Sequence, residues 1–231
     1  MSTAVLTIDD ISSRNTPAIV DYLKEKGIRP ILFAVGVNVE KFYDEAVYAV
    51  KSGAIVGNHS YSHPAFSTLT LREAIEEIEK CEAVLDKLYK DSGVLRVHRP
   101  FRFPYGDKGG KIAADLQEYL KQAGFSKADD SMISYDWWKN SSLSTDIDTF
   151  WTFDFEEYRL PHNDGYTQKK MFEKIHDPNP RYGAPLLKEG SCHFILMHAH
   201  DETDAVMPGY FKTLIDHALD NGVRIIDPSF V

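Results

Sequence analysis

Short apolar runs alternate with amphipathic segments along the whole chain. Nearly continuous apolar residues occupy positions 4–8, 31–35 and 54–56, and again 192–197 and 223–226. Runs of this length without polar alternation are typical of strands buried on both faces of a parallel sheet. The segments between them repeat apolar residues every three or four positions, which predicts helices. The alternation predicts an α/β fold, and six or more βα units in one domain indicate a barrel or barrel-like closure.

The amphipathic segments carry recognisable start and stop signals. Thr16-Pro17 predicts a helix start with the threonine as cap, and Gly27 ends that helix. The clearest helix begins with the capping box Thr70-Leu71-Arg72-Glu73, and its apolar residues fall on one face as far as Leu88. We expect further helices over 39–51, 111–123 and 210–219, and further strands ending near Arg102-Phe103 and covering 150–153.

Two stretches do not fit a regular βα repeat. Residues 126–149 are polar with Trp137 and Trp138 embedded, and residues 159–190 contain several prolines and glycines. We expect both to be long loops over one face, the second with a short helix over 168–175. Long loops in compact domains are often functional. Trp137, Trp138, Tyr158 and Tyr166 are candidates for stacking on a ligand, although packing of the loops is an equal alternative. One domain over 1–231 is expected.

Composition limits the classes of partner. The 231 residues carry 26 Lys+Arg against 35 Asp+Glu, a formal net charge of -9. An acidic protein is a poor partner for nucleic acid or an anionic membrane. No apolar stretch approaches membrane-spanning length. Residues 1–231 show no signal peptide, so we expect a cytoplasmic location, with removal of a targeting segment before Met1 as the alternative. Cys81 and Cys192 lack metal-type spacing and are expected to be buried hydrophobic residues.

The first candidate chemistry is an aspartate pair followed by a histidine pair. Asp9 and Asp10 end the first apolar run, and His59 and His63 follow the third. Imidazoles at i and i+4 can converge on one point if the backbone makes a helix-like turn between them. Asp10 with both histidines is a three-ligand set that leaves one metal position open, as in catalytic zinc sites. Zn²⁺ is the expected ion, with Co²⁺ or Ni²⁺ as alternatives, and Asp9 remains as a candidate general base.

Other candidates also fall at the ends of predicted strands, where sites lie in barrel folds. Arg102 can pair with a carboxylate and hold it ionised, and the turn at Tyr105 can aim a backbone N–H at a developing oxyanion. Taken alone, this segment is better explained as a plain turn with a surface arginine. His198 is either an acid that protonates a leaving group or a core histidine. His200 is expected to be more exposed and structural.

Together these motifs resemble a known family. The order Thr-Ile-Asp-Asp, His-Ser-x-x-His, Arg-x-Pro-Tyr and Leu-x-His, from Leu6 to His198, is similar to the polysaccharide deacetylases with a NodB homology domain, carbohydrate esterase family four. The resemblance implies a distorted (β/α)7 barrel, a divalent metal and hydrolysis of an acetyl group from a sugar. By matching position it implies Asp10, His59 and His63 as metal ligands, Asp9 as base, Arg102 as the residue that orients Asp9, the Tyr105 N–H as oxyanion donor and His198 as acid.

Two motifs depart from the family pattern. The family usually has Asp-x-x-Asp-Trp, whose carboxylate tethers the catalytic histidine, whereas the best match here is Asp154-Phe155-Glu156-Glu157-Tyr158. Glu157 is the preferred tether because its segment follows a predicted strand, and Asp136-Trp137 is the rival. In the last motif, Ala199 stands where an aspartate is common, a change whose consequence the sequence does not reveal.

The expected function is removal of an acetyl group from an N-acetylated sugar or oligosaccharide, of chitooligosaccharide or peptidoglycan type. The alternatives are an O-acetyl-polysaccharide esterase, a metal-free allantoinase-like amidohydrolase and a catalytically silent glycan-binding module. The complete Asp-His-His set counts against the metal-free enzyme. Retention of Asp9, Arg102 and His198 counts against a silent module, because binding alone does not need them. The sequence identifies neither the sugar nor the oligomeric state.

Overall fold

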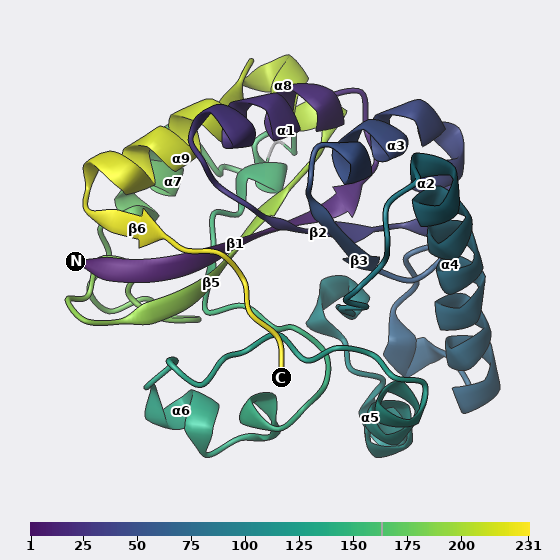
Figure 1. Ribbon diagram of the computed structural model, residues 1–231. Helices are drawn as coiled ribbons and strands as arrows, with labels where there is room; N and C mark the ends of the chain where they lie inside the picture. Colours follow the sequence, from purple (N-terminus) through teal and green to yellow (C-terminus); the bar gives the residue numbers. More distant parts are fainter. Residues whose placement is uncertain (163) are drawn as a thin grey trace.

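The computed structural model describes residues 1–162 and 164–231 (Figure 1). In these residues six strands form one parallel sheet in the order β3-β2-β1-β5-β4, with β6 paired to β1. The strands are β1 (Ser2–Ile11), β2 (Ile31–Ala34), β3 (Ile55–Asn58), β4 (Phe153–Asp154), β5 (Cys192–His198) and β6 (Val223–Ile225). The predicted α/β fold with a parallel sheet is confirmed.

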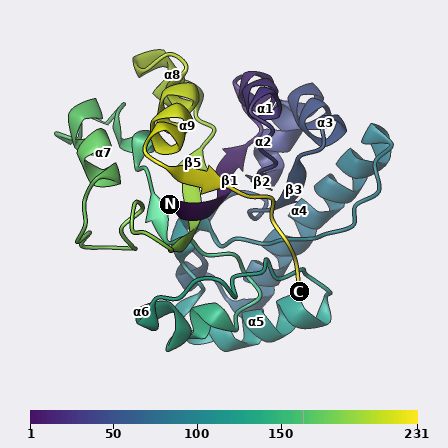
Figure 2. The same ribbon diagram turned by 60° about the vertical axis from the view of Figure 1, so that its left-hand side comes forward.

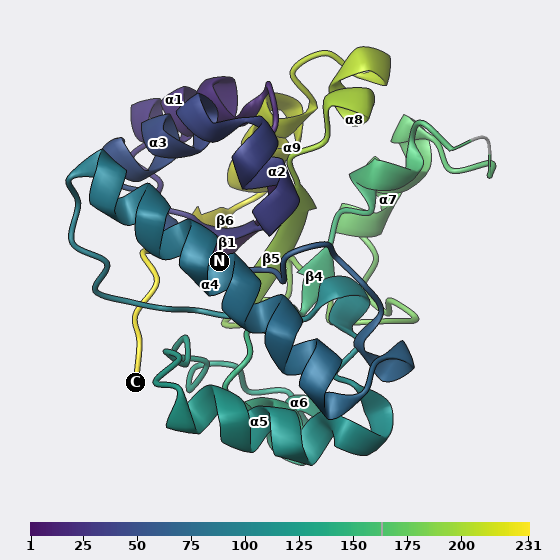
Figure 3. The ribbon, with the colours of Figure 1, turned by 90° about the vertical axis from the view of Figure 1, so that its right-hand side faces the viewer.

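Helices surround the sheet on the outside, with α1 to α4 following one another around it (Figures 2 and 3). They are α1 (Thr16–Glu25), α2 (Gly36–Lys41), α3 (Tyr43–Lys51), α4 (Leu71–Ser92), α5 (Ala113–Gln122), α6 (Asp136–Lys139), α7 (Gln168–Ile175), α8 (Asp201–Val206) and α9 (Tyr210–Asp220). Thr70 and Glu73 form the predicted capping box of α4. No helix within the described ranges has the length and apolar character needed to cross a membrane.

An irregular segment closes the ring of backbone hydrogen bonds. Phe101 forms a single parallel bridge with Asn58 at the end of β3. The carbonyl of Phe101 accepts a hydrogen bond from Thr149 N at 2.8 Å, and Thr152 N donates to Phe194 O of β5 at 2.9 Å. The residues from Thr149 to β4 therefore link the two outer sides of the sheet. This closed path is that of a barrel in which the segment at Phe101 takes the place of a strand but is too short to count as one.

Several predicted boundaries are wrong for local reasons. The predicted strand at Arg102-Phe103 is reduced to the bridge at Phe101, because the chain turns away at Pro104. The predicted helix over 39–51 is two helices, since Phe42 leaves the helical region with φ -124° and ψ 56°. Thr16 is the first residue of α1 and not its cap, and its hydroxyl accepts from Ser13 N.

Other expectations hold with small shifts. The strand predicted over 150–153 is β4, two residues long and displaced towards Asp154. The first strand is longer than predicted and includes both aspartates. The short helix expected over 168–175 is α7, and the region 126–149 is largely irregular apart from the single turn of α6 and a 3-10 helix at Ser142–Ser144. Cys81 and Cys192 are buried, as expected.

Gly57 in β3 allows the chain at Pro100 to approach closely. A Cβ added at Gly57 would lie 2.5 Å from the Pro100 carbonyl oxygen and 2.7 Å from its Cγ. Asn58 N, the next residue's amide, donates to the same carbonyl oxygen at 2.9 Å. The absence of a side chain at this position therefore sets the spacing between β3 and the segment that carries Arg102.

We expect Gly57→Ala to lower the free energy of unfolding by about 1–3 kcal/mol, the usual cost of an overpacked interior position. The methyl group must push β3 and the Pro100 backbone apart, because a carbonyl cannot move aside as a flexible side chain can. Urea unfolding followed by tryptophan fluorescence measures the change. An unfolding midpoint equal to that of the wild type would contradict this close packing.

Candidate functional site

Strand register brings Asp9 and His198 together. These two residues are paired across β1 and β5, at the carboxyl ends of both strands. Paired residues of neighbouring strands project to the same face of a sheet. Thr7 lies two positions before Asp9 and therefore also shares this face. One acid and one imidazole thus stand side by side at the edge where parallel-sheet enzymes place their sites.

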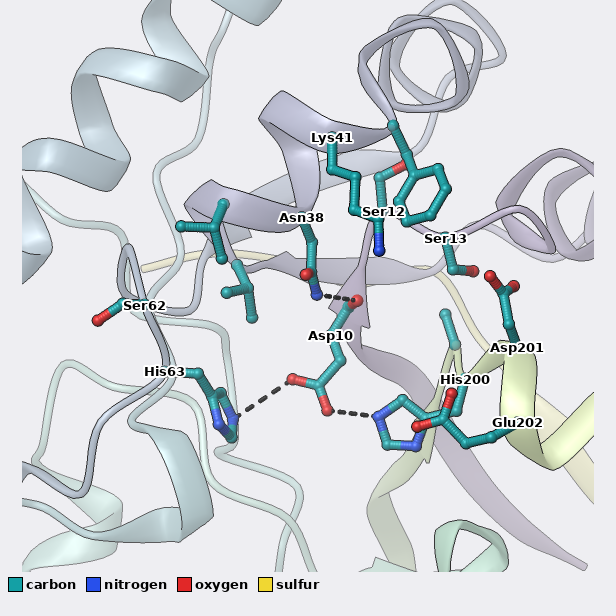
Figure 4. Close-up of a pocket in the computed structure, with 14 residues that line it drawn as sticks. Asp10, Ser12, Ser13, Asn38, Lys41, Ser62, His63, His200, Asp201 and Glu202 are labelled. Atoms are coloured by element: carbon teal, nitrogen blue, oxygen red, sulfur yellow. Dashed lines mark hydrogen bonds and ion pairs between the residues drawn. The ribbon is translucent and has the colours of Figure 1, made fainter. Parts of the chain in front are cut away.

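Asp10 reaches the same site only because the backbone departs from a regular strand. Adjacent strand residues point to opposite faces, so Asp9 and Asp10 should diverge. Asp10 instead has a left-handed φ of 64°, and the pairing with β2 shifts register between Ile8 and Ile11. Asn38 of α2 donates to the Asp10 carbonyl at 3.1 Å and holds this bend (Figure 4).

His59 and His63 come together through a bent loop, so the expected helix-like turn is wrong. Ser60 and His63 both have left-handed φ values, 66° and 61°. Ser60 N donates to the Asn58 side chain at 2.8 Å, and His63 N donates to Ser60 Oγ at 3.1 Å. The two imidazole rings lie 4.9 Å apart between centroids. The spacing of the histidines was informative, but the backbone conformation between them was not predictable from it.

Asp10, His59 and His63 form a group whose donor atoms lie within 4.8 Å of one another. Asp10 Oδ1 is 3.7 Å from His59 Nε2 and 3.3 Å from His63 Nε2. This oxygen is buried and has no hydrogen-bond partner within the described part of the chain. An unpaired buried carboxylate oxygen is costly, and one carboxylate with two imidazoles matches the ligand set of a catalytic divalent metal. The residues therefore fit a metal.

The hydrogen bond of His59 and the pKa of His63 both suit metal binding. His59 Nδ1 lies 2.8 Å from the Arg102 carbonyl oxygen, which can only accept, so this nitrogen donates and Nε2 keeps its lone pair for the site. Burial lowers the pKa of His63 to about 4 against the opposing charge of Asp10, so the ring is neutral near pH 7. Burial would raise the pKa of Asp10, but the hydrogen bond from His200 and the surrounding imidazoles hold it well below its ordinary value.

Arg102 is a fully buried cation that holds Asp9. Its Nη1 lies 2.8 Å from Asp9 Oδ1 and 2.8 Å from Thr7 Oγ1, and its Nε donates to the Thr149 carbonyl at 2.9 Å. The guanidinium also lies over the ring of Phe33, 4.4 Å from its centroid. With Arg102 1% exposed and Asp9 3% exposed, each charge depends on the other for its compensation. The plain-turn alternative for this arginine is wrong.

His198 is held by Glu157, which is 0% exposed. Glu157 Oε1 accepts from the backbone N of His198 and lies 3.1 Å from its Nδ1. Asp154 is close enough to form a three-residue group with both. Burial opposes charge on the ring, but the hydrogen bond to Glu157 and the charges of Glu157, Asp154 and Asp10 raise the pKa of His198 to about 10. The pairing stabilises the fold fully below about pH 6.5, the ordinary histidine value, and this contribution is lost as pH rises through about 10.

Tyr105 lies at the mouth of the site in a left-handed conformation. Its φ is 59°, its ring packs against His63 with centroids 4.5 Å apart, and its side chain is largely exposed. Five non-glycine residues in the described ranges have a left-handed φ, and all of them belong to or adjoin this site: Asp10, Ser60, His63, Tyr105 and Glu156. Such conformations are uncommon and cluster where side chains must be aimed for function.

Two cavities meet at Asp10, His63 and His200. One, of about 260 Å³, also contacts Asp9, His59 and His198, and its outer wall is formed by Tyr105, Trp151, Asp154, Tyr158 and Leu196. The other, of about 350 Å³, extends towards α2 and α8 (Figure 4). Lys41 and Glu202 lie on its walls. The first cavity offers apolar and aromatic surface for a small acyl group beside the acids and imidazoles.

The structure corrects the sequence reading at several residues. His200 was expected to be structural, but its Nε2 lies 2.7 Å from Asp10 Oδ2. Trp151 lines the cavity and was not singled out; its place within the strand predicted over 150–153 was the available signal. Of the proposed stacking residues, Tyr158 lines the cavity, Trp138 is buried and hydrogen-bonded to Asp130, and Tyr166 donates to the Phe155 carbonyl. Asp136, the rival tether, lies on α6 and is not in the group around His198.

Comparison with known proteins identifies the family of the chain. Residues 1–128 match the sequence model of a family described as polysaccharide deacetylase. The chain is 36% identical over 110 residues to chitin deacetylase 1 of Cryptococcus neoformans, covering 47% of this chain and 22% of that protein. It is 36% identical over 84 residues to a peptidoglycan-N-acetylglucosamine deacetylase of Bacillus cereus, covering 36% and 30%. The chain thus matches less than a third of the length of these two relatives.

Solved structures share the fold over almost the whole chain. A chitin deacetylase from Colletotrichum lindemuthianum superposes with a TM-score of 0.66 at 21% identity, covering 97% of this chain and 84% of that one. A carbohydrate esterase family four pseudoenzyme, BA3943 from Bacillus anthracis, superposes with a TM-score of 0.60 at 21% identity, covering 96% and 62%. Likeness at this identity shows the fold alone, and that fold occurs in both active and inactive proteins.

We expect Arg102→Met to lower the free energy of unfolding by about 3–5 kcal/mol, because it leaves the buried Asp9 carboxylate without its partner. Urea unfolding measures the loss. Arg72→Met is the matched control, since the exposed pair of Arg72 with Glu76 contributes little. Equal losses of unfolding free energy in the two variants would show that the buried Arg102–Asp9 pair contributes no more to stability than the exposed pair.

We expect Glu157→Gln to lower the pKa of His198 by at least about one, a tenfold change in its acid dissociation constant, because a neutral amide no longer favours the charged ring. An NMR titration of the histidine ring protons in metal-free protein measures this. His193 serves as internal reference: it is buried, hydrogen-bonded to Thr152 and Ser191, and should titrate alike in both proteins. An unchanged His198 titration would exclude Glu157 as the tether.

Proposed function

This chain belongs to the polysaccharide deacetylase family, and on that premise we propose that it is a metal-dependent hydrolase that removes the acetyl group from an N-acetylated sugar or oligosaccharide. The observation that carries the proposal is the unpaired, buried Asp10 Oδ1 facing two imidazoles, with Asp9 held beside them by Arg102. The relatives are deacetylases of chitin and of peptidoglycan N-acetylglucosamine, which supports an N-acetylated amino sugar as substrate.

Asp10, His59 and His63 would hold the metal, with Zn²⁺ as the first candidate and Co²⁺ or Ni²⁺ as alternatives. When bound there, the metal would polarise the acetyl carbonyl and lower the pKa of a water molecule. An ion in this place would also give the unpaired Asp10 oxygen a partner.

The remaining residues divide the proton transfers between them. Asp9 takes the proton from the attacking water, and its Oδ2 is placed for this 3.5 Å from His59 Nε2 while Oδ1 stays on Arg102. The backbone N–H of Tyr105 donates to the oxyanion of the tetrahedral intermediate. His198, kept protonated by Glu157, gives its proton to the departing nitrogen. The base and the acid are therefore paired with groups of opposite charge, Asp9 with an arginine and His198 with a glutamate.

The cavity of about 260 Å³ supports acetyl as the acyl group that is removed. Leu196, Trp151 and Tyr158 form a small apolar wall next to His198. A methyl group fits such a surface, whereas a charged acyl group would lose its hydration there. The same cavity would accept an O-acetyl ester, so the choice between amide and ester depends on the leaving group that His198 protonates.

We expect the purified protein to release acetate from N-acetylglucosamine oligomers, to lose this activity with EDTA and to regain it with added Zn²⁺. Measured acetate is the readout. Release that EDTA does not suppress would favour the metal-free amidohydrolase, and release from acetylated xylan alone would favour the O-acetyl esterase. Binding of glycans without hydrolysis would favour the silent module.

We expect Asp9→Asn to lower kcat by about 10²-fold or more while zinc stoichiometry stays at the wild-type value, because the amide keeps the shape but cannot accept the proton. His59→Ala should instead lose zinc. Acetate release and metal content are measured on the same preparations. Full activity in Asp9→Asn would remove Asp9 from the role of base.

A further inference from the structure

His200 contacts the Asp10 carboxylate from the side opposite His63 (Figure 4). Its Nε2 lies 2.7 Å from Oδ2, while His63 Nε2 lies 3.3 Å from Oδ1. Each oxygen of Asp10 therefore faces a different imidazole. The distances from Asp10 to His59 and His63 run from Oδ1, and His200 is not part of the three-residue metal group found among the described residues.

The chemistry of this contact fixes the proton. The 2.7 Å contact between His200 Nε2 and Asp10 Oδ2 is a hydrogen bond, and a carboxylate that serves as a metal ligand is ionised and can only accept hydrogen bonds. His200 Nε2 must then carry a hydrogen and donate it to Oδ2. A nitrogen that donates in this way has no lone pair for a metal, so His200 acts on Asp10 and not on the ion.

The fold places His200 firmly. Its backbone N donates to the Tyr210 hydroxyl at 3.2 Å, and that hydroxyl donates to the His198 carbonyl. Its ring stacks on the His198 ring with centroids 5.2 Å apart and an angle of 30°. The next residue, Asp201, accepts from Asn15 N at 3.2 Å, which ties the start of α8 to the start of α1. The ring is therefore held before any ligand binds.

We propose that His200 is a positioning residue that occupies Oδ2 of Asp10, so that Asp10 presents Oδ1 alone to the metal. The inference rests on the proposed function, because it requires a metal at Asp10, His59 and His63. A carboxylate that binds through one oxygen leaves a coordination position for water, whereas one that binds through both takes that position. His200 thereby protects the open position that hydrolysis needs.

Removal of the imidazole should weaken metal binding. Without His200, Oδ2 loses its donor, and the carboxylate is free to rotate away from the geometry shared with His59 and His63. Loss of a hydrogen bond to a metal ligand typically costs 10–100-fold in affinity. A glutamine at this position keeps an N–H that can donate to Oδ2 and removes the ring, so it separates donation from direct ligation.

The test is calorimetric titration of metal-free protein with Zn²⁺, which does not depend on any substrate. We expect His200→Ala to bind zinc about 10–100-fold more weakly than the wild type, and His200→Gln to bind close to the wild-type affinity. His98→Ala is the matched control, because His98 stacks on Phe230 outside the site. It should bind zinc as the wild type does. Circular dichroism of the metal-free variants checks that all of them fold.

Two results would overturn the inference while leaving the proposed function intact. Equal zinc affinity in the wild type and His200→Ala would show that the contact does not position Asp10. A loss in His200→Gln as large as in His200→Ala, with both folded, would show that the ring itself binds the metal. A folded wild type that binds no zinc would instead overturn the proposed function together with this inference.

Discussion

The buried ion pair between Arg102 and Asp9 joins the parts of the structure on which the site depends. The Arg102 guanidinium binds Asp9, the proposed base, at the end of β1, and it binds the carbonyl of Thr149 in the closing segment. The backbone carbonyl of the same arginine accepts from His59 Nδ1 and so sets the orientation of a proposed metal ligand. A buried carboxylate is costly without such a partner. The same ion pair therefore stabilises this edge of the sheet and positions the residues of the site.

The site is also where the chain departs from regular backbone geometry. Strand periodicity would send Asp9 and Asp10 to opposite faces, and the left-handed Asp10 brings both carboxylates to one place. A similar departure at His63 brings the second imidazole to the first. Residues in such conformations persist only where the surroundings determine them. Here Asn38 fixes the carbonyl of Asp10, and Ser60 fixes the amide of His63.

Repeating sequence patterns predicted the strands and helices. They did not predict features that depend on a single contact between distant residues. The strand ends that carry Asp9, His59 and His198 followed from apolar runs, and the capping box at Thr70 predicted the start of α4. The role of His200 could not be predicted, because its partner Asp10 lies 190 residues away. The barrel-like closure was predicted from the number of βα units, but its link at Thr149 could not be, since it is a single backbone hydrogen bond from Thr149 N to Phe101 O. Glu157 was chosen over Asp136 by its place after a strand, and the structure puts Glu157 against His198.

The proposed function requires a metal ion that joins Asp10, His59 and His63. The most direct measurement is anomalous X-ray diffraction from crystals of the chain loaded with one equivalent of Zn²⁺. We predict a single strong peak at about 2.0–2.2 Å from Asp10 Oδ1, His59 Nε2 and His63 Nε2, with His200 still on Oδ2. A peak elsewhere, or no peak in crystals of folded protein, would contradict it.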